Sequence, residues 1–385
     1  MTDLVTEPVN ADEAPAEPSR WRTAAEWVLL YVLSIGGALA ISAGLVAITG
    51  NSWQKVFGAL LDGAFLAEGR WGNTLTVAAP LLLVALGMVI GVKAGLFNIG
   101  QEGQLLMGAM AMAFVGTKLA GPGPVLLIVG LLLGVVGGGA YAGIAGIMKY
   151  RRNVPEVIST LLLVFIAYQI VGYAITTDWL LRDTDPDRPS RAVTSAIMPD
   201  GVRLPVIRMF GNEFPIGFVL ALILAFLVAF VLARTVWGFR FRLLGSNPKV
   251  AQKTGIAANR TGGLALFLSG GFAGLAGAIM LAGGSSGFRL TTGFAINIGW
   301  QGLLVALVAG SNALACIPVA ILFAALRTGA GFLASTGVDR KIVDVVQALL
   351  VLALLIPPAI MFVRRRRKAL AMADEEQDLI EAESQ

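Results

Sequence analysis

The sequence predicts an all-α polytopic membrane protein, and three observations lead to this fold class. Hydrophobic residues make up 56% of the 385 residues and charged residues only 14%, against roughly 25% charged in an ordinary soluble domain. Apolar runs of about 20 residues recur along the chain, each long enough to cross the hydrocarbon core as a helix. Because these runs are continuous and do not alternate, helices rather than a closed barrel are expected to satisfy the backbone in lipid.

The N-terminal residues 1–22 are Pro-rich and acidic, which is typical of a disordered tail. They do not form a signal peptide, because the start is not basic and the apolar run that follows is of spanning length. We expect a transmembrane domain over residues 23–363, with an external loop at 178–213, a cytoplasmic loop at 237–260 and a cytoplasmic tail at 364–385. Its ten predicted spans cover approximately 27–49, 74–93, 103–120, 124–148, 156–177, 215–235, 261–283, 298–312, 314–334 and 341–363.

The distribution of cations orients these spans in the membrane. With the N-terminus inside, the cytoplasmic segments hold 17 Lys and Arg residues and the external segments hold 11, five of them in one long loop. The positive-inside rule discounts such long loops, so both termini are expected in the cytoplasm. The net charge of +5 is then explained by topology and by a basic run, Arg364–Lys368, at the inner face, and it gives no indication of nucleic-acid binding.

A ten-residue stretch, GLFNIGQEGQ at 95–104, returns in degenerate form as INIGWQGLL from residue 296. Each matched pair is 199 residues apart: Asn98, Ile99, Gly100 and Gly103 pair with Asn297, Ile298, Gly299 and Gly302. The match predicts a duplicated unit, spans two to five and seven to ten, with spans one and six as additions. Span three would begin at its motif on the inner side and span eight on the outer side, which makes the repeats inverted. The alternatives are a chance match in a chain with 47 glycines, and a re-entrant pair in place of the short spans eight and nine.

Paired interruptions of this kind indicate a translocation site in membrane transporters. Polar side chains within spans should face the bundle interior or a wet cavity, because they are costly in lipid. Glu102 is alternatively a charge placed favourably at a helix start. The aromatic residues beside the motifs, Phe294 included, are candidates for stacking on a substrate ring, or else lipid and packing contacts. The predicted path residues are Asn98, Glu102, Asn297, Gln301, Phe97 and Trp300, with Gln169, Arg327 and Asp344 in second rank.

The cytoplasmic segment RTVWGFRFRLLGSNPKVAQKTGIAANR, residues 234–260, contains signals for a short helix. Asn247 can cap it, Pro248 suits its first turn, and Gly255 can end it. This helix either seats in a partner on the inner face or is only a capped turn in a solvated loop. The external loop 178–213, which mixes Asp with Arg and Pro, is either a docking surface for an external protein or a plain linker.

Four separated motifs resemble one family. GSNPKVAQKTGI, followed by SGGFAGLAGAIM, resembles the permeases of ABC importers in the branched-chain amino acid and ribose group. GLFNIGQEGQLLMGA and NVPEVISTLLLVFIAYQI resemble its nucleoside and simple-sugar branch, and the likeness covers about 73–360. Two departures leave the substrate open: Ser246 stands where many relatives have Glu, and Val164 where they have Asn. Branched-chain amino acids remain the alternative substrate.

The resemblance implies a ten-span permease subunit that pairs with a second permease, docks cytoplasmic ABC ATPase subunits and receives substrate from an external binding lipoprotein. Length and the extended N-terminus favour the larger of two different permeases, with a homodimer as the alternative. The ATPase-coupling residues implied by the resemblance are Asn247, Pro248, Lys249, Gly255 and Ile256.

Enzyme chemistry is not expected in this chain. LSGG at 268–271 resembles an ATPase signature, but it lies inside an apolar span and no G-x-x-x-x-G-K-[ST] phosphate loop occurs. With no histidine and a single cysteine, Cys316, neither a cofactor nor a metal site is predicted. A secondary transporter running on an ion gradient would need intramembrane carboxylates, and Glu102, Glu156 and Asp344 all lie near span ends. A polytopic membrane enzyme would need clustered nucleophiles, acids or metal ligands, and none are visible.

Overall fold

The computed structural model describes residues 20–48, 50, 52–184, 193–209, 212–335 and 340–383, which are almost entirely helical. The first 19 residues of the predicted tail lie outside this part of the chain. Six described helices are long and apolar enough to cross a membrane, by length and composition. A helix stands at each of the ten predicted spans, namely α1 (Arg20–Ile48), α3 (Arg70–Lys93), α4 (Gln101–Lys118), α5 (Gly123–Arg152), α6 (Glu156–Thr176), α7 (Ile216–Arg234), α10 (Ala258–Ala282), α11 (Ile298–Val308), α12 (Cys316–Ser335) and α13 (Arg340–Glu383).

Several shorter elements complete the described fold. α2 (Trp53–Leu61) and the π-helix η2 (Asp62–Leu66) lead into α3, and α8 (Val236–Ser246) precedes α9 (Pro248–Lys253). On the opposite side from α9, a 3-10 turn, η3 (Asp200–Val202), is followed by an antiparallel hairpin of β1 (Val206–Met209) and β2 (Asn212–Pro215). None of these except α9 was predicted, because they are too short to give a clear hydrophobic period.

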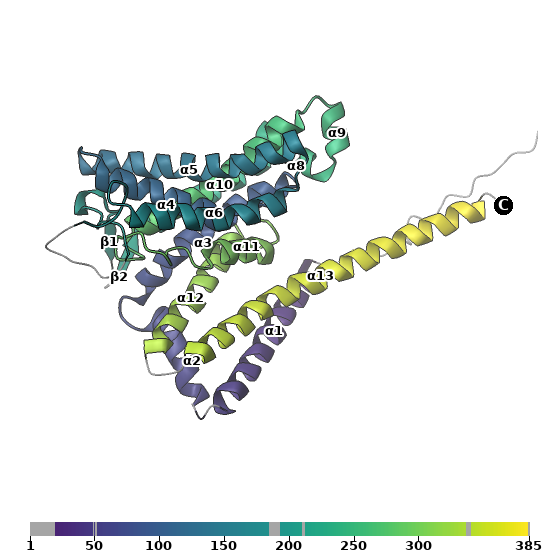
Figure 1. The fold of residues 1–385 in the computed structure, drawn as a ribbon. Coiled ribbons are helices and arrows are strands. Elements are labelled where there is room, and N and C mark those ends of the chain that lie inside the picture. The colour runs from purple at the N-terminus through teal and green to yellow at the C-terminus, as the bar shows by residue number, and fades with distance from the viewer. Residues whose placement is uncertain are drawn as a thin grey trace, which may run out of the picture.

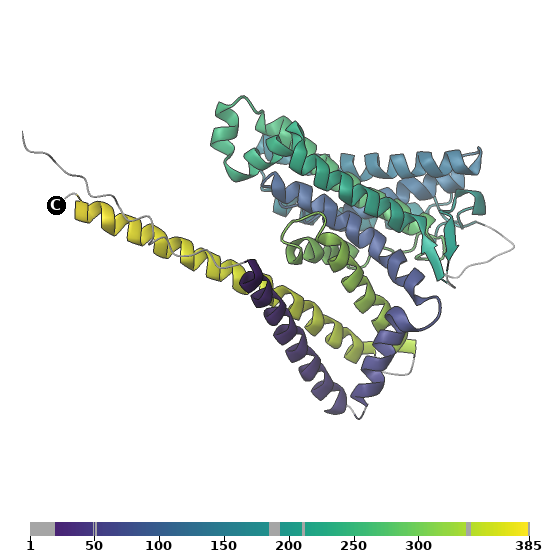
Figure 2. The same ribbon diagram turned by 180° about the vertical axis from the view of Figure 1, so that it is seen from behind.

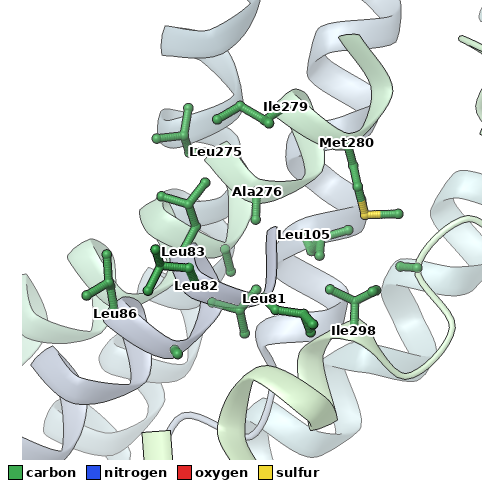
Figure 3. Packing of buried hydrophobic residues seen from close by; sticks show 14 of the residues in the cluster. Leu81, Leu82, Leu83, Leu86, Leu105, Leu275, Ala276, Ile279, Met280 and Ile298 are labelled. Carbon is green, nitrogen blue, oxygen red and sulfur yellow. The ribbon is translucent and has the colours of Figure 1, made fainter. Parts of the chain in front are cut away.

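The core is built around α3, whose residues Leu81–Leu86 are fully buried. Figure 3 shows these leucines packed against Leu275 and Ile279 of α10 and against Leu105 of α4. Lipid offers little hydrophobic drive for helix association, so close packing of small residues takes its place. A Cβ added at Gly277 or Gly274 would overlap the backbone of α4 or α5, so these glycines allow the close approach of the three helices.

Helices α1 and α13 form an arm that is splayed from the compact body of α3 to α10 (Figures 1 and 2). The Ser34 hydroxyl joins the two helices by donating to the Ala353 carbonyl at 2.6 Å. α2, η2 and α12 connect the arm to the body. A Cβ added at Gly329 of α12 would lie 2.5 Å from the Leu60 carbonyl oxygen of α2, so the two backbones are in close contact. α13 continues as a helix through the basic run to Glu383, so the described part of the C-terminal segment is helical.

The two predicted repeats have the same helix order, α3 to α6 and α10 to α13, with a motif directly before the second helix of each. One expectation was wrong: the starts of α4 and α11 do not lie at opposite faces, because they contact each other. The segment between α10 and α11 turns back into the protein, where Leu290, Phe294 and Ala295 are buried. It therefore carries the second motif inward to meet the first.

Candidate translocation site and coupling segment

Asn98 of the first motif is fully buried and uses its whole side-chain amide in hydrogen bonds. Its Nδ2 donates to Gln104 Oε1 at 2.7 Å and to Ser269 Oγ of α10 at 2.9 Å. Its Oδ1 accepts from Gln104 Nε2 at 2.9 Å and from the Gly100 amide at 3.2 Å. In this conformation Asn98 therefore fastens the loop before α4 to α10 and has no hydrogen-bonding group left for a ligand.

Glu102 and the second motif meet at the start of α11. Glu102 is buried, and its Oε1 accepts a hydrogen bond of 3.2 Å from the Asn297 amide. The amides of Gly299 and Trp300 also face this carboxylate. A carboxylate of α4 thus lies at the positive end of the α11 dipole, which favours its charge. The predicted role of Glu102 as a helix-start charge holds for the neighbouring helix.

Tyr168 of α6 completes this carboxylate site, since its hydroxyl also donates to Glu102 Oε1. The second oxygen, Oε2, is buried and has no hydrogen bond of normal geometry among the described residues. Sequence reasoning missed Tyr168, although a polar group within a span was a usable signal. Its neighbour Gln169, a second-rank candidate, is exposed.

Arg327 of α12 ties the second motif from the other side. Its Nη1 donates to Gln301 Oε1 at 3.2 Å, and its Nη2 donates to the Ile296 carbonyl at 3.1 Å. Arg327 and Glu102 attract each other electrostatically. The structure therefore brings together Glu102, Asn297, Gln301 and Arg327, while the Asp344 side chain lies outside the described residues.

The aromatic candidates divide into exposed and buried groups. Phe97 and Trp300 are 41% and 42% exposed, so both rings are free to contact another molecule. Phe294 is only 5% exposed and belongs to the core. Of the three rings, Phe97 and Trp300 are therefore accessible and Phe294 is not.

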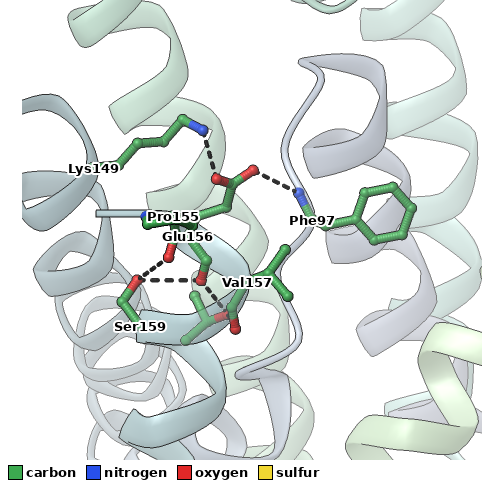
Figure 4. Close-up of polar contacts among 7 residues, drawn as sticks. Phe97, Lys149, Pro155, Glu156, Val157 and Ser159 are labelled. Atoms are coloured by element: carbon green, nitrogen blue, oxygen red, sulfur yellow. Dashed lines mark hydrogen bonds and ion pairs between the residues drawn. The ribbon is translucent and has the colours of Figure 1, made fainter. Parts of the chain in front are cut away.

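The loop before α4 is also held from the α5–α6 side, as Figure 4 shows. The Glu156 carboxylate accepts from Lys149 Nζ at 2.5 Å and from the Phe97 amide at 3.4 Å. Glu156 is buried at the first turn of α6. This ion pair was not predicted, because Lys149 and Glu156 stand on two helices whose relative placement depends on the turn between them.

α9 confirms the predicted capped helix. Asn247 Oδ1 accepts from the Val250 amide at 3.1 Å, and Pro248 occupies the first helical position. Gly255 has a φ of +81°, and the Ile256 amide donates to the Ala251 carbonyl at 2.9 Å to close the helix end. α9 stands out from the body at one end of the molecule, and Ala251 is its one buried residue (Figure 1). Lys249 is exposed on its surface.

Two glycines join this segment to the first motif. A Cβ added at Gly95, which has a φ of +73°, would lie 2.9 Å from the Gly245 Cα. A Cβ added at Gly245 would overlap the Lys93 carbonyl. The backbone just before Asn98 is therefore in direct contact with the end of α8, two residues before the cap of α9.

At the other end of the molecule, the described parts of the 178–213 loop pack onto the segment after α10. The Ser195 amide donates to the Leu290 carbonyl at 2.9 Å, and the Met198 amide donates to the Phe288 carbonyl at 3.0 Å. Arg289 and Asp183 form an ion pair at 3.0 Å. The described parts of the loop thus form a folded surface, which covers the segment that leads to the second motif.

Comparison with known proteins yields one family and several relatives. The family of the branched-chain amino acid transport system permease component matches residues 70–355. The guanosine ABC transporter permease protein NupP of Bacillus subtilis is 31% identical over 344 residues, 89% of this chain and 97% of its own length. The glucose ABC transporter permease protein TsgB13 of Haloferax volcanii is 30% identical over 87% of this chain and 89% of its own length. The nucleoside ABC transporter permease protein NupB of Lactococcus lactis is 29% identical over 73% of this chain and 77% of its own length. No solved structure matches the chain.

Proposed function

The chain belongs to the branched-chain amino acid transport permease family, and from this premise we propose that it is the membrane path of an ATP-driven importer of nucleosides or related simple sugars. It is a multi-pass protein of the plasma membrane. The substrate class is supported by the guanosine and glucose permeases, which resemble nearly the whole chain. ATP hydrolysis belongs to a separate ATPase subunit in this proposal, and this chain needs no cofactor.

The observation that carries the proposal is the meeting of the two motifs at Glu102. A buried carboxylate is stable in lipid only with partners, and here these come from α6, α11 and α12. In the proposed cycle the described conformation is the closed one, in which Glu102 latches α4 to the start of α11. Separation of these helices opens Gln301 and the buried Glu102 Oε2, beside the already exposed Asn297, to a polar substrate, which has hydroxyl and N–H donors.

The exposed helix α9 is the proposed docking point for the ATPase, with Asn247, Pro248, Lys249, Gly255 and Ile256 as the coupling residues. Movement of α9 reaches the path through α8, because Gly245 at its end lies against Gly95. Packed backbones without intervening side chains transmit displacement directly, since interiors are close-packed. The Phe97 amide, held by Glu156, is the next link toward Asn98.

The positions of the remaining partners depend on the orientation of the chain, in which both termini and α9 are proposed to be cytoplasmic. A substrate-binding lipoprotein would dock on the surface formed by the described parts of the 178–213 loop at the opposite end. A second permease subunit, different from this chain, would complete the path. Tight selection of substrate would then reside in the lipoprotein, which suits a path with few polar contacts.

The test is uptake into proteoliposomes that hold this chain with its ATPase, second permease and lipoprotein. We expect ATP-dependent uptake of labelled guanosine or glucose, and no uptake of labelled leucine. Asn247→Ala with Pro248→Ala should lower both substrate-stimulated ATP hydrolysis and uptake by at least about tenfold, because α9 loses its cap and first turn. Asn259→Ala, at an exposed asparagine outside α9, is the matched control and should change neither.

Two results would contradict this function. Uptake of leucine in place of guanosine and glucose would assign the chain to the amino acid importers. Uptake that continues at full rate without ATP, and stops when an ion gradient is removed, would make it a secondary transporter.

A further inference from the structure

An apolar groove of about 1000 Å³ lies between the arm and the body of the protein. Its walls come from four helices: the first half of α1, the end of α11, the start of α12 and residues 354–362 of α13. No charged side chain lines it, and Trp27 and Tyr31 are its members with polar N–H or O–H groups. The lining is therefore suited to hydrocarbon rather than to a nucleoside or a sugar.

The length of the groove corresponds to one leaflet of a bilayer. Six residues of α13 between Leu354 and Phe362 border it, and at 1.5 Å per residue this stretch covers about 13 Å. Half of a hydrocarbon core of roughly 30 Å is about 15 Å. Trp27 and Tyr31 stack at 6.0 Å on the α1 wall, toward the end where aromatic residues mark a membrane interface.

Positive charge stands where the groove ends. The basic run Arg364–Lys368 begins two residues after Phe362, and Arg366 follows Phe362 by four residues, on the same face of α13. Arg364, Arg366 and Arg367 are exposed. Basic clusters beside transmembrane helices attract anionic lipid head groups.

We propose that this groove binds one anionic phospholipid of the inner leaflet, with an acyl chain along α13 and the phosphate at Arg364, Arg366 and Arg367. The assignment to the inner leaflet rests on the proposed orientation. An apolar channel that ends at cations matches the two halves of such a lipid, whereas a protein helix would leave the arginines unpaired. The bound lipid fills the space between arm and body and so joins α1 and α13 to α11, which carries the second motif.

The test uses the full chain, purified in detergent from membranes with its partner subunits, and measures bound phospholipid by mass spectrometry. We expect phosphatidylglycerol to be enriched over its share of the bulk membrane. Arg366→Gln with Arg367→Gln should lower the affinity for phosphatidylglycerol over phosphatidylcholine by about fivefold or more in nanodiscs of defined composition. Arg151→Gln with Arg152→Gln, at the exposed end of α5, is the control for charge and should leave the ratio unchanged.

A second pair of variants tests the acyl-chain half. Ala359→Phe or Val319→Phe fills the groove and should remove about one bound lipid per chain, whereas Leu352→Phe, outside the groove on the same helix, should not. Equal anionic shares in bound and bulk lipid, or a share that neither pair of variants alters, would overturn the proposal. A disulfide that forms between the Ala359→Cys variant and a cysteine of the second permease would also overturn it, because protein would then cover the groove. These measurements of bound lipid do not depend on transport. Failure of the lipid proposal can therefore be distinguished from failure of the proposed importer function.

Discussion

The two copies of the motif have similar residues but opposite surroundings. Asn98 is buried with four hydrogen bonds, whereas Asn297 is exposed and adopts a left-handed φ of +63°. In the first copy, Gly100 and Gly103 pack on α6 of their own repeat. In the second, Gly299 and Gly302 pack on α4 and α3 of the other repeat. By its glycines the first copy is therefore an anchor packed within one half, which the Asn98 hydrogen bond to Ser269 also ties to α10, and the second copy is a joint whose glycines pack between the halves.

Glu102 is the group on which this difference depends, so its replacement should have the largest effect. Glu102→Ala removes the acceptor for Tyr168 and for the Asn297 amide, and it leaves the start of α11 without its charge. Loss of charged hydrogen bonds costs about 1.5–3 kcal/mol each. We expect uptake to fall by more than about tenfold, together with a marked drop in the melting temperature in detergent.

Glu102→Gln separates the charge from the geometry, because the amide oxygen can still accept from Tyr168 and Asn297. We expect it to retain most of the thermal stability while losing uptake, if separation of the halves exposes a charged group to the substrate. Full uptake by Glu102→Ala would exclude a junction between the repeats at this carboxylate.

The next largest effect should come from Gly299→Ala. Its Cβ would lie 2.5 Å from the Glu102 amide nitrogen, a backbone atom that cannot turn away. Overpacking of this kind costs about 1–3 kcal/mol. Gly100→Ala is similarly crowded, 2.6 Å from the Thr160 carbonyl oxygen, but the crowding stays within the first repeat.

We therefore expect both glycine variants to melt at lower temperature, and Gly299→Ala alone to lose uptake out of proportion to its stability. Gly143→Ala of α5, where a Cβ meets nothing within 4 Å, is the control and should be neutral or slightly stabilising. Equal losses of uptake in Gly100→Ala and Gly299→Ala would remove the distinction between anchor and joint.

Replacement of the two asparagines should have smaller effects, and stability should fall more for the buried Asn98 than for the exposed Asn297. Asn98→Ala leaves the buried polar groups of Gln104 and Ser269 without partners, which costs about 1–3 kcal/mol. Asn297→Ala loses no buried hydrogen bond of its side chain but strains the left-handed backbone, by about 1–2 kcal/mol. Asn297→Gly should restore the stability, because glycine adopts this φ freely.

Thermal unfolding of the three variants in one detergent measures this order directly. A larger loss for Asn297→Ala than for Asn98→Ala, or no rescue by glycine, would contradict the assignment of the two sites.

The sequence was sufficient for the parts of the fold that depend on local signals. Ten apolar runs gave ten helices, and Asn247, Pro248 and Gly255 placed α9 at its observed position. These features depend on hydropathy and capping, which act over a few residues. The repeat was visible as matched Asn and Gly residues, because close helix contacts need glycine wherever they occur.

What the sequence could not supply was the depth at which the two motifs meet. The loop from Gly283 to Asn297 turns inward through tertiary packing of Leu290 and Phe294, and no periodicity marks such a turn. For the same reason Tyr168 was missed as a partner of Glu102, and Asn98 was not recognised as a saturated anchor. Polar residues in spans could be identified from the sequence, but their partners depend on which helices touch.

The smallest effect is expected from the two exposed rings, and it tests whether the asymmetry extends to the substrate. Phe97 and Trp300 contribute little to the core, so Phe97→Ala and Trp300→Ala should shift stability by less than about 0.5 kcal/mol. If the joint is the side that receives substrate, Trp300→Ala should raise the KM for guanosine roughly two- to tenfold, the loss of a stacking contact of about 0.5–1.5 kcal/mol. Phe97→Ala, whose backbone is fixed by Glu156, should leave the KM unchanged and lower only the maximal rate, through the coupling loop. Glucose has no aromatic ring, so uptake of glucose by the same variants separates a loss of stacking from a general change in the path. An equal rise in KM for both substrates would argue against stacking at Trp300.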